Sequence, residues 1–77
     1  MREIKVLGPG CSNCKTTAAL IEDVARDRGL EIHLTKVVEM KDIVAYGIMS
    51  TPGVVVDERV VHAGGVPSRV KVESWFA

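Results

Sequence analysis

Residues 8–15, GPGCSNCK, place the two cysteines of the chain, Cys11 and Cys14, three positions apart where the sequence pattern changes. The residues just before, at positions 3–7, are typical of a β-strand, and the Gly-Pro-Gly that follows them ends it. From Ser12 onward, apolar residues recur at helical spacing. The stretch therefore marks a strand-to-helix junction that carries a pair of thiols at the start of the helix.

The rest of the chain predicts an α/β fold with the element order βαβαββα. The helix that begins at Ser12 is expected to end at Gly29. A strand–helix–strand order implies a parallel pair with a right-handed crossover. We expect a four-stranded mixed sheet in the order 2-1-3-4, with the first and third helices on one face and the second on the other. The remaining elements are expected at residues 30–38 (strand), 39–46 (helix), 54–56 and 60–62 (a hairpin around 57–59), and 67–76 (helix).

The two short helices need apolar faces to pack, and the sequence offers candidates for both. The helical spacing of these residues predicts that one side of each helix is buried. The expected core residues are Met40, Ile43 and Val44 in the second helix, and Val70, Trp75 and Phe76 in the third.

Composition narrows the classes of function. The 77 residues suffice for a single domain, 1–77, and 47% of them are apolar. Ten basic and ten acidic residues cancel, so no net charge favours nucleic acid or anionic lipid. No apolar run is long enough for a membrane span, and the N-terminus lacks the apolar stretch of a signal peptide. We therefore expect a cytoplasmic protein, a monomer, with no nucleic-acid or membrane partner.

The cysteine pair has three possible roles: a structural staple, half of a metal site, or a redox-active pair. Structural disulfides are rare in the cytosol, and a bridge across so short a loop would restrict the unfolded chain little. At the start of a helix, unpaired N–H groups and the helix dipole favour an anion, so Cys11 is expected to have a lowered pKa and to be the attacking sulfur. Cys14 lies one turn further on, within bonding reach. Gly10 leaves room for a substrate backbone beside Cys11, and Lys15 adds a positive charge.

A second stretch, YGIMSTPGVVV at residues 46–56, resembles the segment before the third core strand of thioredoxins and glutaredoxins. VLGPGCSNC at 6–14, VVVDERVVHAGG at 54–65 and VPS at 66–68 extend the likeness over nearly the whole chain. The sequence is most similar to the small thioredoxin-like proteins described as redox-active disulfide proteins, which keep a minimal, glutaredoxin-sized core.

The resemblance implies a thiol–disulfide oxidoreductase in which Cys11 is the nucleophile and Cys14 the resolving thiol. It also implies a cis Pro52 beside the cysteines, with main-chain groups of Thr51 holding an extended substrate segment. The redox-active disulfide Cys11–Cys14 would take the place of a cofactor. The implied partners are a disulfide-bearing protein or small molecule and an electron donor of the thioredoxin-reductase or glutathione type.

The sequence departs from ordinary thioredoxins at three places. Gly10 stands where thioredoxins have a tryptophan, and Ser12-Asn13 replaces the Gly-Pro between the cysteines. Lys5 falls near the position of the buried acid that accepts a proton in thioredoxins. Efficient reduction of protein disulfides in general is therefore less strongly implied than the exchange chemistry itself.

Two other functions use the same thiols. A soft-metal chaperone for copper(I) or zinc also carries CxxC after its first strand, but its element order is βαββαβ, and a zinc site needs two further ligands. His33 and His62 are the remaining soft ligands, and both are expected to be solvated or packed on strands. A redox-sensing module would share the fold, and only repeated turnover distinguishes it from an oxidoreductase.

Overall fold

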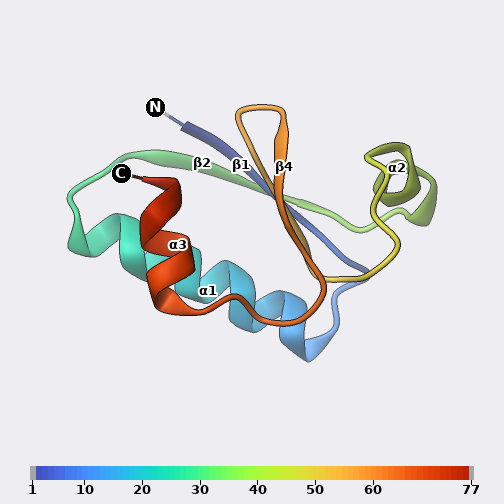
Figure 1. Ribbon diagram of the computed structural model, residues 1–77, viewed down its shortest axis with the longest axis horizontal. Coiled ribbons are helices and arrows are strands. Elements are labelled where there is room, and N and C mark those ends of the chain that lie inside the picture. The colour runs from blue at the N-terminus through green and yellow to red at the C-terminus, as the bar shows by residue number, and fades with distance from the viewer. Residues whose placement is uncertain (1, 77) are drawn as a thin grey trace.

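The computed structural model describes residues 2–76, which form four strands and three helices in the predicted order (Figure 1). The sheet order is β2-β1-β3-β4; β1 is parallel to β2 and antiparallel to β3, and β3 is antiparallel to β4. The predicted topology is confirmed. The elements are β1 (Arg2–Leu7), α1 (Ser12–Asp27), β2 (Ile32–Val37), α2 (Met40–Ala45), β3 (Gly53–Val56), β4 (Arg59–Ala63) and α3 (Arg69–Trp75).

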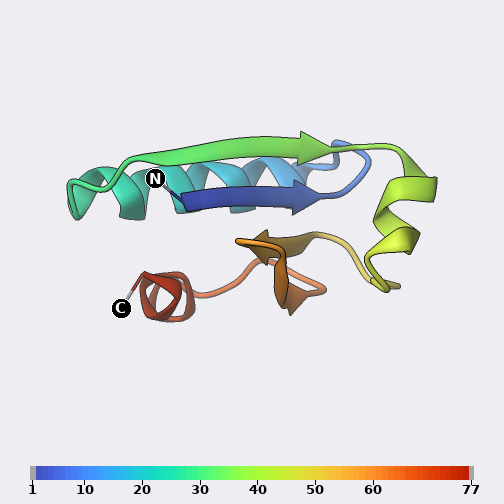
Figure 2. The same cartoon turned by 90° about the horizontal axis from the view of Figure 1, so that it is seen from above.

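The helices divide between the two faces of the sheet, as expected. Helices α1 and α3 lie together on one side, where they cover the main core (Figure 1). Helix α2 lies beyond the ends of β1 and β2 (Figure 2), and its Ile43 packs with Leu7 and Val55 in a smaller core on the opposite face. Within residues 2–76, no helix combines the length and apolar character needed to cross a membrane.

The predicted apolar faces of the short helices were partly wrong. In α2 only Ile43 is buried, because the helix packs against the end of the sheet and leaves Met40 and Val44 mostly exposed. In α3 the buried residue is Val72, whereas Val70 is 75% exposed. Helix α3 begins at Arg69 rather than Pro67 and is capped by Ser68. Val72 and the buried Phe76 lie four residues apart and therefore share the face toward the core, whereas Val70, two positions before Val72, lies on the opposite side of the helix. Trp75, also predicted as a core residue, is half-buried.

This correction can be tested with two equivalent substitutions. Val72→Ala should lower the free energy of unfolding by about 2 kcal/mol, because it removes fully buried methyl groups and leaves a cavity. Val70→Ala should change it by less than about 0.5 kcal/mol, since the side chain is already solvated. Urea denaturation of both variants measures the difference; equal losses would contradict the observed face of α3.

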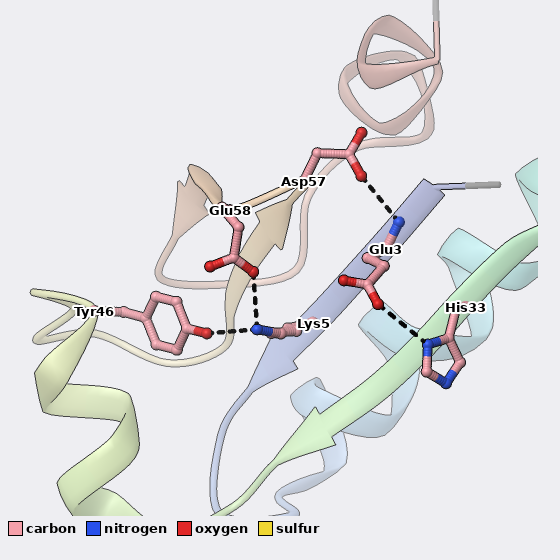
Figure 3. Close-up of polar contacts among 6 residues, drawn as sticks. All are labelled: Glu3, Lys5, His33, Tyr46, Asp57 and Glu58. Atoms are coloured by element: carbon pink, nitrogen blue, oxygen red, sulfur yellow. Dashed lines mark hydrogen bonds and ion pairs between the residues drawn. The ribbon is translucent and has the colours of Figure 1, made fainter.

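The β3–β4 hairpin closes through a two-residue turn, shorter than the predicted loop at 57–59. Asp57 and Glu58 both have positive φ, 46° and 70°, and Arg59 already pairs with Val56. Two left-handed residues match the type I′ turn that suits the twist of a hairpin. The turn is tied to β1, where the Asp57 carboxylate accepts a hydrogen bond from the Glu3 N–H (Figure 3).

Candidate active site

Cys11 occupies the N-cap position of α1, directly after the loop that leaves β1. Its extended backbone (φ −68°, ψ 167°) turns the chain into the helix, and its Sγ accepts a hydrogen bond from the Cys14 N–H at 3.3 Å. Sulfur therefore takes the place of the oxygen that usually caps a helix. The side chain is exposed, so a thiolate here has both a hydrogen-bond donor and access to substrate.

Cys14 lies one turn into α1 and faces the sheet, with only 5% of its surface exposed. Space for its sulfur is provided by Gly8, since a Cβ at position 8 would overlap the Cys14 Sγ. Gly8 is fixed in place because its N–H continues the pairing of β1 with β2 through the Val37 carbonyl, at 2.9 Å. The two thiols thus differ sharply in access, although they are neighbours on one helix.

The electrostatic environments of the two thiols also differ. Hydrogen bonds from the Cys14 side chain and then from its N–H lower the pKa of Cys11. Burial, followed by the hydrogen bond between the two thiols, raises the pKa of Cys14. The first thiolate to form is therefore that of Cys11, on the accessible sulfur.

The loop before β3 brings Thr51 to the same region. A Cβ at Gly8 would lie 3.7 Å from the Thr51 Cβ, which places Thr51 beside the glycine that contacts Cys14. The Thr51–Pro52 peptide bond is cis, and Pro52 is buried with its carbonyl bonded to the Gly64 N–H. Gly10 is exposed, with φ +91°, and a Cβ there would have open space around it.

Lys5 does not take the place of a proton-accepting acid. Its ammonium group donates hydrogen bonds to the Tyr46 hydroxyl at 2.8 Å and to the Glu58 carboxylate at 3.0 Å (Figure 3). These bonds, that to Tyr46 first, raise the pKa of Lys5 above its usual range. Lys5 therefore remains charged and joins β1 to the segment after α2 and to the hairpin turn.

The two histidines lie on strands β2 and β4 and make local polar contacts there, as expected for solvated or strand-packed residues. His33 is exposed on β2, with its Nδ1 3.7 Å from the Glu3 carboxylate (Figure 3), and His62 contacts Lys71 and the Gly65 carbonyl. Among residues 2–76, no three His, Cys, Asp or Glu side chains gather closely enough to hold a metal ion.

Two residues near the thiols were not singled out from the sequence. Gly8 was interpreted only as the end of a strand, and Lys36 only as part of β2. Both line a cavity of about 60 Å³ next to Cys14. A signal for Lys36 existed, since the alternation of β2 places it on the same side as Ile32 and Leu34, where an apolar residue is the rule.

A mixed sheet in the order β2-β1-β3-β4, with a pair of thiols at the start of α1 and a buried proline before β3, defines a thioredoxin-like protein. Comparison with known proteins agrees. The thioredoxin domain family matches residues 2–77, and the chain belongs to this family.

The thioredoxins of two archaea are among its relatives. The chain is 27% identical to that of Methanothermobacter thermautotrophicus, over 95% of both chains. It is 29% identical to that of Methanocaldococcus jannaschii, over 84% of this chain and 74% of the other. The solved structure of thioredoxin-2, a component of the protein secretion machinery of the malaria parasite, has the same fold. The two structures superpose with a TM-score of 0.70 and 12% sequence identity, over 99% of this chain and 81% of that one. The protein is a thiol–disulfide oxidoreductase of the thioredoxin class.

Proposed function

We propose that Cys11 and Cys14 carry the exchange reaction, with Cys11 as the nucleophile and Cys14 as the resolving thiol. The observation that carries this assignment is the contrast between an exposed Cys11 at the N-cap of α1 and a buried Cys14 one turn later. The Cys11 thiolate attacks one sulfur of a substrate disulfide, and the other substrate sulfur leaves as a thiolate. Cys14, once deprotonated, attacks the Cys11 Sγ and releases the second substrate thiolate. The products are a dithiol and the Cys11–Cys14 disulfide.

Substrate is proposed to dock as an extended segment between Gly10 and the Thr51–Pro52 loop. The absence of a side chain at Gly10 allows a substrate backbone to approach Cys11. Thr51 is half-buried beside Gly8, and its main chain would pair with the segment as an added strand. The buried Pro52 would hold Thr51 in this position.

The reaction as proposed needs no cofactor besides the two thiols, but it does need a supply of electrons. Each turnover oxidises the pair, so a donor of the thioredoxin-reductase or glutathione type must return it to the dithiol. Disulfide-bearing proteins or small molecules are the proposed substrates. We propose that the protein acts as a monomer in the cytoplasm, where such reductants are present.

The order of reactivity of the two thiols tests the assignment. Iodoacetamide given in limiting amounts to the reduced protein near neutral pH should alkylate Cys11 well before Cys14, because the lowered pKa and exposure of Cys11 both favour its thiolate. Peptide mass spectrometry after quenching measures the ratio. In urea the two rates should become similar, which serves as the control. Equal rates in the folded protein would remove the nucleophile assignment.

Repeated turnover distinguishes this function from the redox-sensing alternative. With excess dithiothreitol and a disulfide peptide, an oxidoreductase should reduce many equivalents of peptide for each protein molecule. A sensor would be oxidised once and then be re-reduced slowly. Peptide thiol production per mole of protein is the measurement.

A further inference from the structure

Two consecutive glycines, Gly64 and Gly65, follow β4 and begin the connection to α3 (Figure 1). Both have a positive φ, 84° and 71°. Glycine adopts such conformations readily, but it also loses more conformational freedom on folding than any other residue. A pair of glycines therefore stays in one conformation only where its surroundings hold it there.

The Gly64–Gly65 segment lies against the loop before β3 that carries Thr51 and Pro52. The Gly64 N–H donates a hydrogen bond to the Pro52 carbonyl at 2.9 Å. A Cβ at Gly64 would lie only 3.2 Å from the Ser50 Cβ, so the two segments are in close contact. A displacement of Gly64 would therefore act directly on the loop proposed to dock the substrate.

His62, the second-last residue of β4, holds the other end of this segment. Its Nε2 lies 2.8 Å from the Gly65 carbonyl oxygen, and its Nδ1 lies 2.9 Å from the Lys71 Nζ. A lysine ammonium group only donates hydrogen bonds, so the Nδ1 accepts. The proton of the neutral ring is then on Nε2, which donates to the Gly65 carbonyl. Lys71 thus selects the tautomer that the bond to Gly65 requires.

The imidazole ring is itself held by the folded core. The backbone of His62 pairs with that of the buried Val54 in β3. Its ring lies beside the ring of Trp75 in α3, with the two centroids 6.3 Å apart and the planes inclined by 50°. Trp75 in turn packs against the main core. The ring is therefore fixed from β4 and α3, and it is a firm anchor for the two glycines.

We propose that His62 is a positioning residue for substrate docking. Its hydrogen bond to the Gly65 carbonyl restrains the Gly64–Gly65 segment, and this segment keeps Thr51 and Pro52 in the arrangement that an extended substrate requires. His62 acts through this segment and contacts neither the substrate nor the reacting sulfurs. The inference rests on the proposed docking of substrate at the Thr51–Pro52 loop.

The variants His62→Leu and His62→Gln separate the hydrogen bond from the bulk of the ring. Leucine keeps an apolar side chain but has no donor, whereas the glutamine amide has an N–H donor near the place of Nε2. With dithiothreitol as the electron donor, His62→Leu should raise the KM for a disulfide peptide roughly twofold to tenfold, the effect of one lost hydrogen bond, and leave kcat unchanged. His62→Gln should restore the wild-type KM.

A small disulfide provides the contrast in substrate. Bis(2-hydroxyethyl) disulfide has no peptide backbone to pair with Thr51, so its rate of reduction should be the same in His62→Leu and the wild type. His33→Leu is the matched control variant, because His33 is exposed on β2 and its ring lies near Glu3 instead. It should leave the kinetics with both disulfides unaltered. Equal slowing with both disulfides in His62→Leu would contradict the proposal.

Hydrogen exchange tests the restraint without any substrate. In His62→Leu the Gly64 amide should exchange roughly twofold to tenfold faster relative to the amides of β1, because the segment opens more often. If the Gly64 amide exchanges as in the wild type, or if it exchanges faster while the KM for the peptide is unchanged, the proposal is wrong. If the wild-type protein does not turn over the peptide, the proposed function fails instead, and the exchange rates still decide whether His62 restrains the segment.

Discussion

Cys11→Ser is expected to abolish turnover of disulfide substrates, with a loss on the order of 10³-fold or more. A serine hydroxyl remains protonated where the Cys11 thiol ionises, so the hydrogen bond from the Cys14 N–H would have no thiolate to stabilise. Cys14 cannot substitute, because it is buried and its pKa is raised. Reduction of a peptide with one intramolecular disulfide, with dithiothreitol as the electron donor, measures the loss.

Cys14→Ser should fail at a different stage. The exposed Cys11 still attacks, but the mixed disulfide is no longer resolved from within the protein. Mass spectrometry should therefore detect a stable adduct of peptide and protein that dithiothreitol releases. Two results for the Cys11→Ser variant would contradict the proposed roles. One is turnover close to that of the wild type, and the other is a peptide adduct formed on its Cys14.

Much of the fold was predictable because its signals are local. The change from alternating to helical spacing after Leu7 located α1, and Gly29, which has a positive φ of 65°, ends it as expected. The strand–helix–strand order then gave the parallel pairing of β1 and β2 by the right-handed crossover rule. These features depend on residues close together in the chain, so sequence alone was sufficient.

Other features depend on contacts between distant residues. Lys5 donates hydrogen bonds to Tyr46 and Glu58, which lie 41 and 53 residues away in the sequence. No periodicity in the sequence indicates which lysine will form such contacts. The buried face of α3 depends on which of its residues contact the core, and the prediction grouped Val70 with Trp75 and Phe76, whereas Val72 and Phe76, four residues apart, form the buried face. The proposed pairing of Thr51 with substrate came from family resemblance and stays a prediction.

The role of Gly8 in the site likewise could not be predicted from the sequence pattern. The sequence presents Gly8 as a strand terminator, yet in the folded protein its lack of a side chain makes room for the Cys14 sulfur. Its φ is not positive, so alanine is acceptable to the backbone, and the cost of a side chain is steric. The strand cannot easily move away, because the Gly8 N–H is bonded to the Val37 carbonyl.

Gly8→Ala should therefore displace the Cys14 sulfur, either by rotating the side chain or by moving the start of α1. We expect a loss of about 1–3 kcal/mol in the free energy of unfolding, as for other overpacked cores. A larger effect is expected on resolution, because the attacking sulfur leaves its position one turn from Cys11. Urea denaturation measures the first effect. The rate at which the mixed disulfide of Cys11 with a peptide is resolved, followed by mass spectrometry of quenched samples, measures the second.

A double-mutant cycle with Cys14→Ala identifies the cause. Without the Sγ, the new methyl group has the Cys14 Cβ at 3.3 Å as its nearest neighbour, a tight contact but not an overlap. Gly8→Ala should then cost about 1–2 kcal/mol less in the Cys14→Ala background than in the wild type. Gly10→Ala provides the contrast, since its strain comes from a φ of +91° with no atom nearby, and its cost should be the same in both backgrounds. If Gly8→Ala costs the same with and without the sulfur, Gly8 is required for a backbone reason instead. If the cost falls as expected, the strand that precedes the thiols controls where the second thiol can lie, and Gly8 is as much a part of the site as the two cysteines.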